Sequence, residues 1–97
     1  MYTETALFDL LLPDDSRTLK QKRSYVRPIV AMLRRLEVSV AEVGAHDLYG
    51  RAQIGVAVVA GEPGHARQVI DACERQVAGR PEIELLSVRR RLHGDDD

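Results

Sequence analysis

The spacing of apolar and polar residues changes several times along the chain, and each change marks a new element of secondary structure. Four segments alternate between apolar and polar residues or form short apolar runs, which is typical of β-strands. Two longer segments repeat their apolar residues every three or four positions, which is typical of amphipathic helices. The predicted elements are strands over residues 6–12, 38–43, 54–60 and 83–92, a helix from Thr18 to about Leu36, and a helix between Pro63 and Gly79.

The order of these elements is β-α-β-β-α-β, and it predicts an α+β fold of the ferredoxin-like type. In this sandwich, one antiparallel sheet of four strands carries both helices on one face, and the spatial strand order is 4-1-3-2. The 97 residues fit a single domain. We therefore predict one ferredoxin-like domain over residues 1–93, followed by an acidic tail over residues 94–97.

The first strand separates a core face from an open face of the sheet. Its even-numbered apolar residues, which we assign to the core, are Ala6, Phe8, Leu10 and Leu12. Leu7 and Leu11 share the opposite face with Asp9. Because both helices cover the core face, Leu7 and Leu11 would be exposed on a monomer. We therefore predict a homodimer that buries the open face.

The first helix carries both a start signal and an interruption. Thr18 and Gln21 have the spacing of a capping box, in which the Thr18 hydroxyl accepts from the Gln21 amide and the Gln21 side chain reaches back. Pro28 lies in the interior of the helix, where it removes one backbone hydrogen bond and crowds the preceding turn. The sequence therefore predicts a kink at Pro28 or a helix in two pieces.

Composition favours a reducing compartment and excludes disulfide-stabilised and membrane-spanning classes. Hydrophobic residues make up 44% of the chain, which argues against disorder. Cys73 is the only cysteine, so no intramolecular disulfide can form. No apolar run approaches the roughly 20 residues that a membrane span needs, and the N-terminal segment lacks the pattern of a signal peptide. We therefore predict a cytoplasmic protein with no membrane partner.

Charge is distributed unevenly along the chain, although the net charge is only -1. Residues 16–35 contain seven Lys and Arg residues and no Asp or Glu. Four of them share one face of the predicted helix beside its apolar arc, and we call them the basic stripe: Lys20, Arg23, Arg27 and Arg34. Such a stripe favours contacts with the phosphates of RNA, although a solvated helix face has the same composition. We predict that the stripe binds nucleic acid.

Lys22 differs from its basic neighbours because the helical wheel places it within the apolar arc. An unpaired buried ammonium is costly, so Lys22 must reach solvent or pair with a carboxylate. Asp9, Glu42 and Asp47 are the candidate partners, all on elements that approach this end of the sandwich. We predict an ion-pair network of Lys22, Glu42, Asp47 and Arg51, and a structural role is its simpler interpretation.

Catalytic and metal-binding chemistry have little support in the sequence. Glu42 and Asp47 could act as a general acid and base, but no nucleophile or pocket accompanies them. The three histidines fall on separate elements and Cys73 on the apolar stripe of the second helix, so no pair has the spacing of zinc ligands. Aromatic residues are only 4% of the chain, which disfavours RNA recognition by stacking of bases on the sheet. We therefore predict no enzyme activity, no metal and no cofactor.

Two segments resemble signatures of the YlxP-like family, a bacterial family of unknown function. Residues 18–23, Thr-Leu-Lys-Gln-Lys-Arg, are similar to its first signature, Ser-Leu-Lys-x-Lys-Arg. Its second signature is similar to residues 39–43 together with Asp47, Arg51, Ala52 and Gly55. Thr18 replaces the usual serine, and Tyr49 stands where the family pattern has tryptophan. The resemblance extends over nearly the whole chain.

This resemblance implies a ferredoxin-like fold and no known enzyme activity. Genes of the family often lie beside those for translation initiation factor two and ribosome-binding factor A, which implies a role near translation or ribosome assembly. We therefore predict a non-enzymatic accessory protein that contacts ribosomal RNA or ribosome-associated proteins through the basic first helix. The alternative is a dimeric interaction module that binds no nucleic acid.

Overall fold

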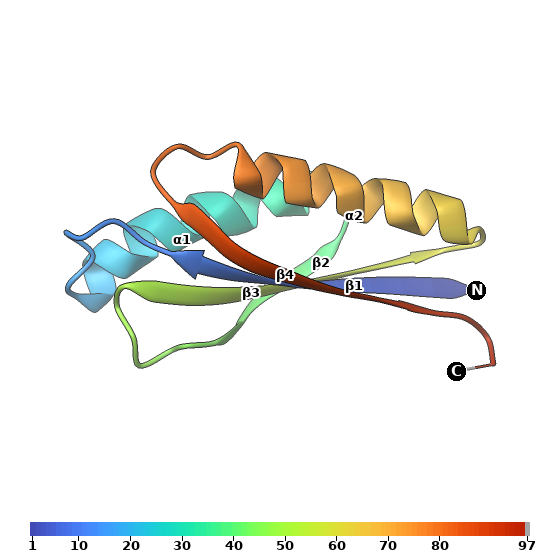
Figure 1. Cartoon of the computed structure of the whole chain (residues 1–97), viewed down its shortest axis with the longest axis horizontal. Coiled ribbons are helices and arrows are strands. Elements are labelled where there is room, and N and C mark those ends of the chain that lie inside the picture. The colour runs from blue at the N-terminus through green and yellow to red at the C-terminus, as the bar shows by residue number, and fades with distance from the viewer. Residues whose placement is uncertain (97) are drawn as a thin grey trace.

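The computed structural model describes residues 1–96, which form four strands and two helices in the predicted order (Figure 1). The strands are β1 (Tyr2–Leu11), β2 (Ser39–Gly44), β3 (Arg51–Ala60) and β4 (Glu84–His93), and the helices are α1 (Leu19–Arg34) and α2 (Pro63–Ala78). β1 and β3 begin earlier than the sequence pattern indicates, because they pair along their whole length, from Tyr2 opposite Ala60 to Leu11 opposite Arg51. The last residue of the predicted acidic tail, Asp97, lies outside the described residues.

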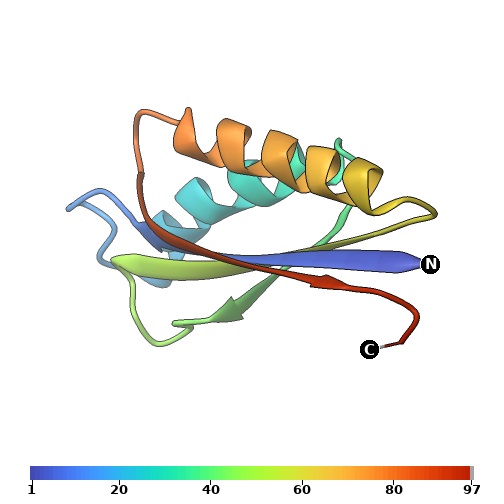
Figure 2. The ribbon, with the colours of Figure 1, turned by 45° about the vertical axis from the view of Figure 1, so that its right-hand side comes forward.

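The four strands form one antiparallel sheet in the order β2-β3-β1-β4. Both helices lie on the same side of this sheet, and no helix of the described chain covers the other side (Figures 1 and 2). The prediction of a ferredoxin-like βαββαβ sandwich is therefore confirmed, including its strand order. β2 and β4 form the two edges of the sheet.

The core lies between the sheet and the two helices and follows the predicted strand parity. Phe8 and Leu10 of β1 and Ile54 of β3 are fully buried, in one cluster with Ile29 of α1 and Ile70 of α2. Burial of each such side chain stabilises the fold by about 1.5–3 kcal/mol before conformational entropy is subtracted. Neither helix can leave the sheet without exposing several of these side chains to water.

α1 begins at a capped turn that is close to the predicted one. The Thr18 hydroxyl accepts from the Gln21 amide (3.1 Å), while the Gln21 side-chain oxygen accepts from the amide of Arg17 (2.9 Å) rather than from that of Thr18. The helix continues through Pro28 as a single element, so of the two predicted alternatives the division into two pieces is wrong, while the kink stays a prediction. The proline is exposed and displaces no core side chain, and buried residues on either side of it hold the helix against the sheet.

Both helices are amphipathic rather than apolar all round. Each has 16 residues with a buried apolar side and a polar exposed side. In the described part of the chain, no helix is long and apolar enough to cross a membrane. On the core side of α2, Cys73 is fully buried, as expected for a small apolar residue in a packed core.

Candidate functional site

Lys22 is the centre of a buried ion pair between α1 and β2. Its side chain is only 3% exposed, and its ammonium nitrogen lies 2.9 Å from Oε2 of Glu42. Glu42 lies opposite Ile54 of β3, whose side chain is in the core, so the Glu42 carboxylate is on the helix side of the sheet. Lys22 lies on the apolar face of α1, and the carboxylate of Glu42 compensates its buried positive charge.

The same ammonium also fixes the turn that follows β2. Lys22 donates to the carbonyl oxygen of Ala45 (2.8 Å), which also accepts from the amide of Leu48 (3.0 Å). Ala45 has a left-handed backbone with φ 59°, a conformation that costs a residue with a Cβ about 1–2 kcal/mol. Two donors on the Ala45 carbonyl offset this cost. Lys22 therefore ties α1 to the hairpin between β2 and β3.

Arg51 and Asp47, the other two residues of the predicted network, lie elsewhere. Arg51 of β3 donates from Nη2 to both carboxylate oxygens of Asp9 on β1, each at 2.9 Å. Asp47 is exposed in the hairpin and forms no ion pair within residues 1–96. The prediction of one network is therefore wrong, because strand parity places Arg51 on the open face of the sheet and Glu42 on the helix face.

The four residues of the basic stripe are exposed along α1 and have no charged partner in the described chain. Lys20, Arg23, Arg27 and Arg34 form no ion pair within residues 1–96. α1 itself contains no Asp or Glu that could pair with them. The stripe therefore presents four positive charges that the described residues leave without a counter-charge.

A groove of about 700 Å³ lies between this face of α1 and the β2 end of the sheet, and we call it the α1–β2 groove. Arg23, Arg27 and Arg34 line it from α1, whereas Glu42 and His46 line it from β2 and the hairpin. Its apolar lining also comes from α1: Leu19, Val26, Val30 and Ala31. The groove thus combines an apolar wall with a positively charged rim.

A shallower hollow of about 380 Å³ lies on the other side of the stripe, and we call it the outer hollow. It is lined by Lys20, Arg23, Ser24, Arg27 and Pro28. Arg23 and Arg27 border both the groove and the outer hollow. The stripe is therefore a positive ridge with a depression on each side.

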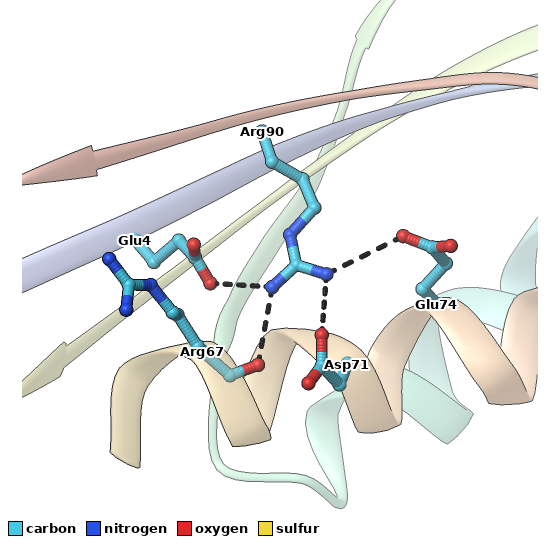
Figure 3. A network of polar contacts seen from close by, with 5 residues as sticks. All are labelled: Glu4, Arg67, Asp71, Glu74 and Arg90. Carbon is cyan, nitrogen blue, oxygen red and sulfur yellow. Dashed lines mark hydrogen bonds and ion pairs between the residues drawn. The ribbon is translucent and has the colours of Figure 1, made fainter. Parts of the chain in front are cut away.

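A second cluster of charges, which we did not predict, lies between β4 and α2 (Figure 3). Arg90 of β4 donates to Asp71 of α2 (2.6 Å) and to Glu4 of β1 (2.8 Å), and it lies 3.6 Å from Glu74. It also donates to the backbone carbonyl of Arg67 (3.2 Å). Glu4 is only 5% exposed, and Arg90 supplies its counter-charge. The cluster fastens β1, β4 and α2 to one another.

The sequence does contain a signal for this cluster. Glu4 has the parity of the core residues Ala6 and Phe8, so a carboxylate was to be expected on the covered face of the sheet. Arg90 lies opposite Ala6 in the register of β1 with β4, which puts it diagonally beside Glu4. We predicted a strand over residues 83–92 but not its register against the first strand. The pairing of Glu4 with Arg90 could be predicted only with the register between β1 and β4.

Packing between β4 and α2 shifts two pKa values. Burial by itself would lower the pKa of Arg90, but the hydrogen bonds to Asp71 and Glu4 outweigh it, so the pKa of Arg90 is raised. Burial raises the pKa of the Cys73 thiol, which disfavours the reactive thiolate. Within residues 1–96, no three His, Cys, Asp or Glu side chains gather where they could hold a metal ion.

Comparison with known proteins assigns the chain to a family. Residues 4–90 match the family described as protein of unknown function, DUF503. The chain belongs to this family. The family description names no activity, ligand or partner, so the YlxP-like resemblance and the ribosomal role that it implies stay predictions. No curated protein matches the chain.

Two designed proteins are similar in structure to this DUF503 chain. The de novo designed protein LFR1 1 with ferredoxin fold matches with a TM-score of 0.54 at 13% identity, over 98% of this chain and 87% of the design. The de novo designed protein Foldit4 matches with a TM-score of 0.57 at 11% identity, over 98% of this chain and 99% of the design. At such low identity these similarities support the fold alone.

Proposed function

We propose that this DUF503 protein is a non-enzymatic accessory protein of the cytoplasm that binds the phosphate backbone of RNA, including ribosomal RNA, through the basic stripe. The proposal rests on one observation: Lys20, Arg23, Arg27 and Arg34 are exposed on one helix without a counter-charge in residues 1–96. Acidic residues one turn away would stabilise an isolated helix of this kind. Their absence from α1 leaves the charges available to an external anion.

The length of the stripe suits a polyanion better than a single phosphate. At a rise of 1.5 Å per residue, Lys20 and Arg34 lie about 21 Å apart along the helix axis. A single phosphate cannot contact both ends, whereas a nucleic-acid backbone offers a succession of charges along one path. Phosphate contacts position a nucleic acid without reading its bases, so we expect little sequence preference.

The test is the salt dependence of RNA binding by a variant with all four stripe residues changed to Gln. Each phosphate contact contributes about 0.7–0.9 to the slope of log affinity against log salt concentration. If all four residues make contact, the slope should become about three units less steep. A matched control changes four exposed arginines outside α1 to Gln and should keep the slope of the parent: Arg67, Arg75, Arg89 and Arg91.

Circular dichroism should show that both variants fold, because exposed substitutions rarely cost more than about 0.5 kcal/mol each. An unchanged slope in the stripe variant would contradict the proposal. An equal loss in both variants would also contradict it, because binding would then depend on overall charge rather than on α1.

The open face of the sheet favours a second candidate, a dimeric interaction module. Val59, Val43 and Leu11 are 64%, 54% and 41% exposed, and Leu7 lines a shallow hollow of about 500 Å³ on this face. Apolar side chains gathered on one face of a monomer favour association. Sedimentation at micromolar concentration would then show a dimer that Val59→Asp dissociates, together with no affinity for RNA. A monomer would exclude this alternative.

A further inference from the structure

The outer edge of β2 has no partner strand in the described chain, so its backbone is available to a ligand other than RNA. β2 pairs with β3 on one side and with no strand of residues 1–96 on the other. An edge strand of this kind presents a row of unpaired amides and carbonyls, on which another chain can add a strand. The α1–β2 groove opens between this strand and α1.

The two edges of the sheet differ in how they resist such pairing. β4 carries the exposed cations Arg89 and Arg91, and charged side chains are a common protection of edge strands. β2 reads Ser-Val-Ala-Glu-Val-Gly, with no Lys, Arg or Pro, and its single charge is held by Lys22. The pairing of β2 with β3 shifts register only between Glu42 and Gly44, which leaves residues 39–42 regular. β2 is therefore the edge that is open to an added strand.

The groove determines which strand would fit. Side chains of a strand added to β2 would alternate between the groove and the open face of the sheet. On the groove side they would meet the apolar wall at Val30 and Ala31 and the guanidinium groups of Arg27 and Arg34. Six residues of β2 extend about 20 Å, similar to the length of α1 above them. The surface suits an extended segment that carries acidic side chains.

We propose that β2 binds an extended acidic segment of a partner protein as a fifth strand of the sheet, with carboxylates of that segment paired to Arg27 and Arg34. A second copy of this chain is a poorer occupant. Two β2 strands paired about a two-fold axis would bring two basic stripes together, and the one carboxylate that lines each groove, Glu42, is already paired with Lys22. This inference does not rest on RNA binding.

The probe is a fluorescein-labelled octapeptide in which valine and glutamate alternate, and its affinity is measured by fluorescence anisotropy. Ala31→Glu places a like charge in the groove and should weaken binding at least about tenfold. Ser24→Glu is the matched control: it adds the same charge to α1 at the outer hollow and should change the affinity less than about twofold. A peptide with alternating valine and lysine should not bind.

Backbone pairing is tested by hydrogen exchange of the protein amides with the peptide present. Amides of β2 should become protected. A peptide with prolines at two adjacent central positions should neither bind nor protect them, since neighbouring residues of a strand donate to opposite sides and one of the two prolines removes a donor to β2 whichever way the peptide runs. Binding without protection of β2 would overturn the inference, as would equal weakening by Ala31→Glu and Ser24→Glu. A protein dimer in which β2 amides are protected without peptide would show that a second copy occupies the edge. Arg27 and Arg34 belong to both proposed surfaces, so the protection of β2 amides, and not RNA affinity, distinguishes binding of an acidic segment from binding of RNA.

Discussion

Two cations lie between the sheet and the helices, Lys22 beside α1 and Arg90 beside α2, and their surroundings differ. Lys22 is 3% exposed and contacts one carboxylate and one backbone carbonyl. Arg90 is 25% exposed and lies near the carboxylates of Glu4, Asp71 and Glu74. A compact ammonium can be buried with few acceptors, whereas a planar guanidinium can bridge groups on several elements.

The comparison also explains where the free charge of the molecule lies. α2 supplies two of the carboxylates around Arg90 from its own sequence. α1 contains no acidic residue, and within residues 1–96 the only carboxylate paired with Lys22 is that of Glu42 on β2. Within the described residues, the remaining cations of α1 therefore form no ion pair, whereas the acids of α2 are paired with Arg90. This difference makes α1, and not α2, the candidate surface for an anionic partner.

The largest effects are expected from the loss of a buried cation, and the first such change is Lys22→Met. The change leaves Glu42 without its counter-charge and frees the Ala45 turn, and removal of one partner of a buried pair costs about 3 kcal/mol or more. The double change Lys22→Met with Glu42→Leu should recover most of this loss, since no buried charge is then unpaired. Urea unfolding measures the free energy of unfolding of the single and the double variant. A loss under about 0.5 kcal/mol for Lys22→Met, the range of ordinary surface changes, would show that the pair is dispensable.

Arg90→Met should destabilise the fold about as much as Lys22→Met, by about 3 kcal/mol or more, because it leaves the carboxylate of Glu4, which is only 5% exposed, without its counter-charge. Arg90→Lys should recover only part of this loss, since an ammonium cannot donate to Glu4 and Asp71 with the same fork geometry. The same urea experiments rank the four variants. A loss under about 0.5 kcal/mol for Arg90→Met, the range of ordinary surface changes, would contradict this expectation.

The smallest effect concerns the pH dependence of stability through Cys73, close to Arg90. Burial raises the pKa of this thiol above its ordinary value of 9.0 in the folded protein. As the pH rises, the Cys73 thiol of the unfolded chain loses its proton before the thiol of the folded protein does. The thiol's contribution to stability is therefore complete below the pKa of the unfolded chain, and it is lost as the pH rises through the pKa of the folded protein. Cys73→Ala should show a flatter decline of urea stability at alkaline pH. An identical pH profile in the variant would contradict this.

The hydrophobic pattern was sufficient to predict the order of elements, the strand order and the core face of β1. These features depend on local periodicity and on the few topologies that a β-α-β-β-α-β chain can adopt. The same periodicity placed Lys22 in the apolar arc of α1, and a buried ammonium requires a carboxylate. The division of α1 at Pro28 was predicted wrongly for a related reason: local sequence shows the lost hydrogen bond but not the packing that keeps the helix continuous.

The sequence by itself determined which residues carry charge on α1, because that face follows from helical periodicity and from the absence of acids. Only the tertiary structure decided which charges meet. Glu42, and not Asp9, reaches Lys22, because the two carboxylates lie on opposite faces of the sheet. Arg90 finds Glu4 through residues that are 86 positions apart in the chain. Such pairings depend on the register between strands and on helix placement, and both are fixed by packing over the whole core rather than by any local pattern.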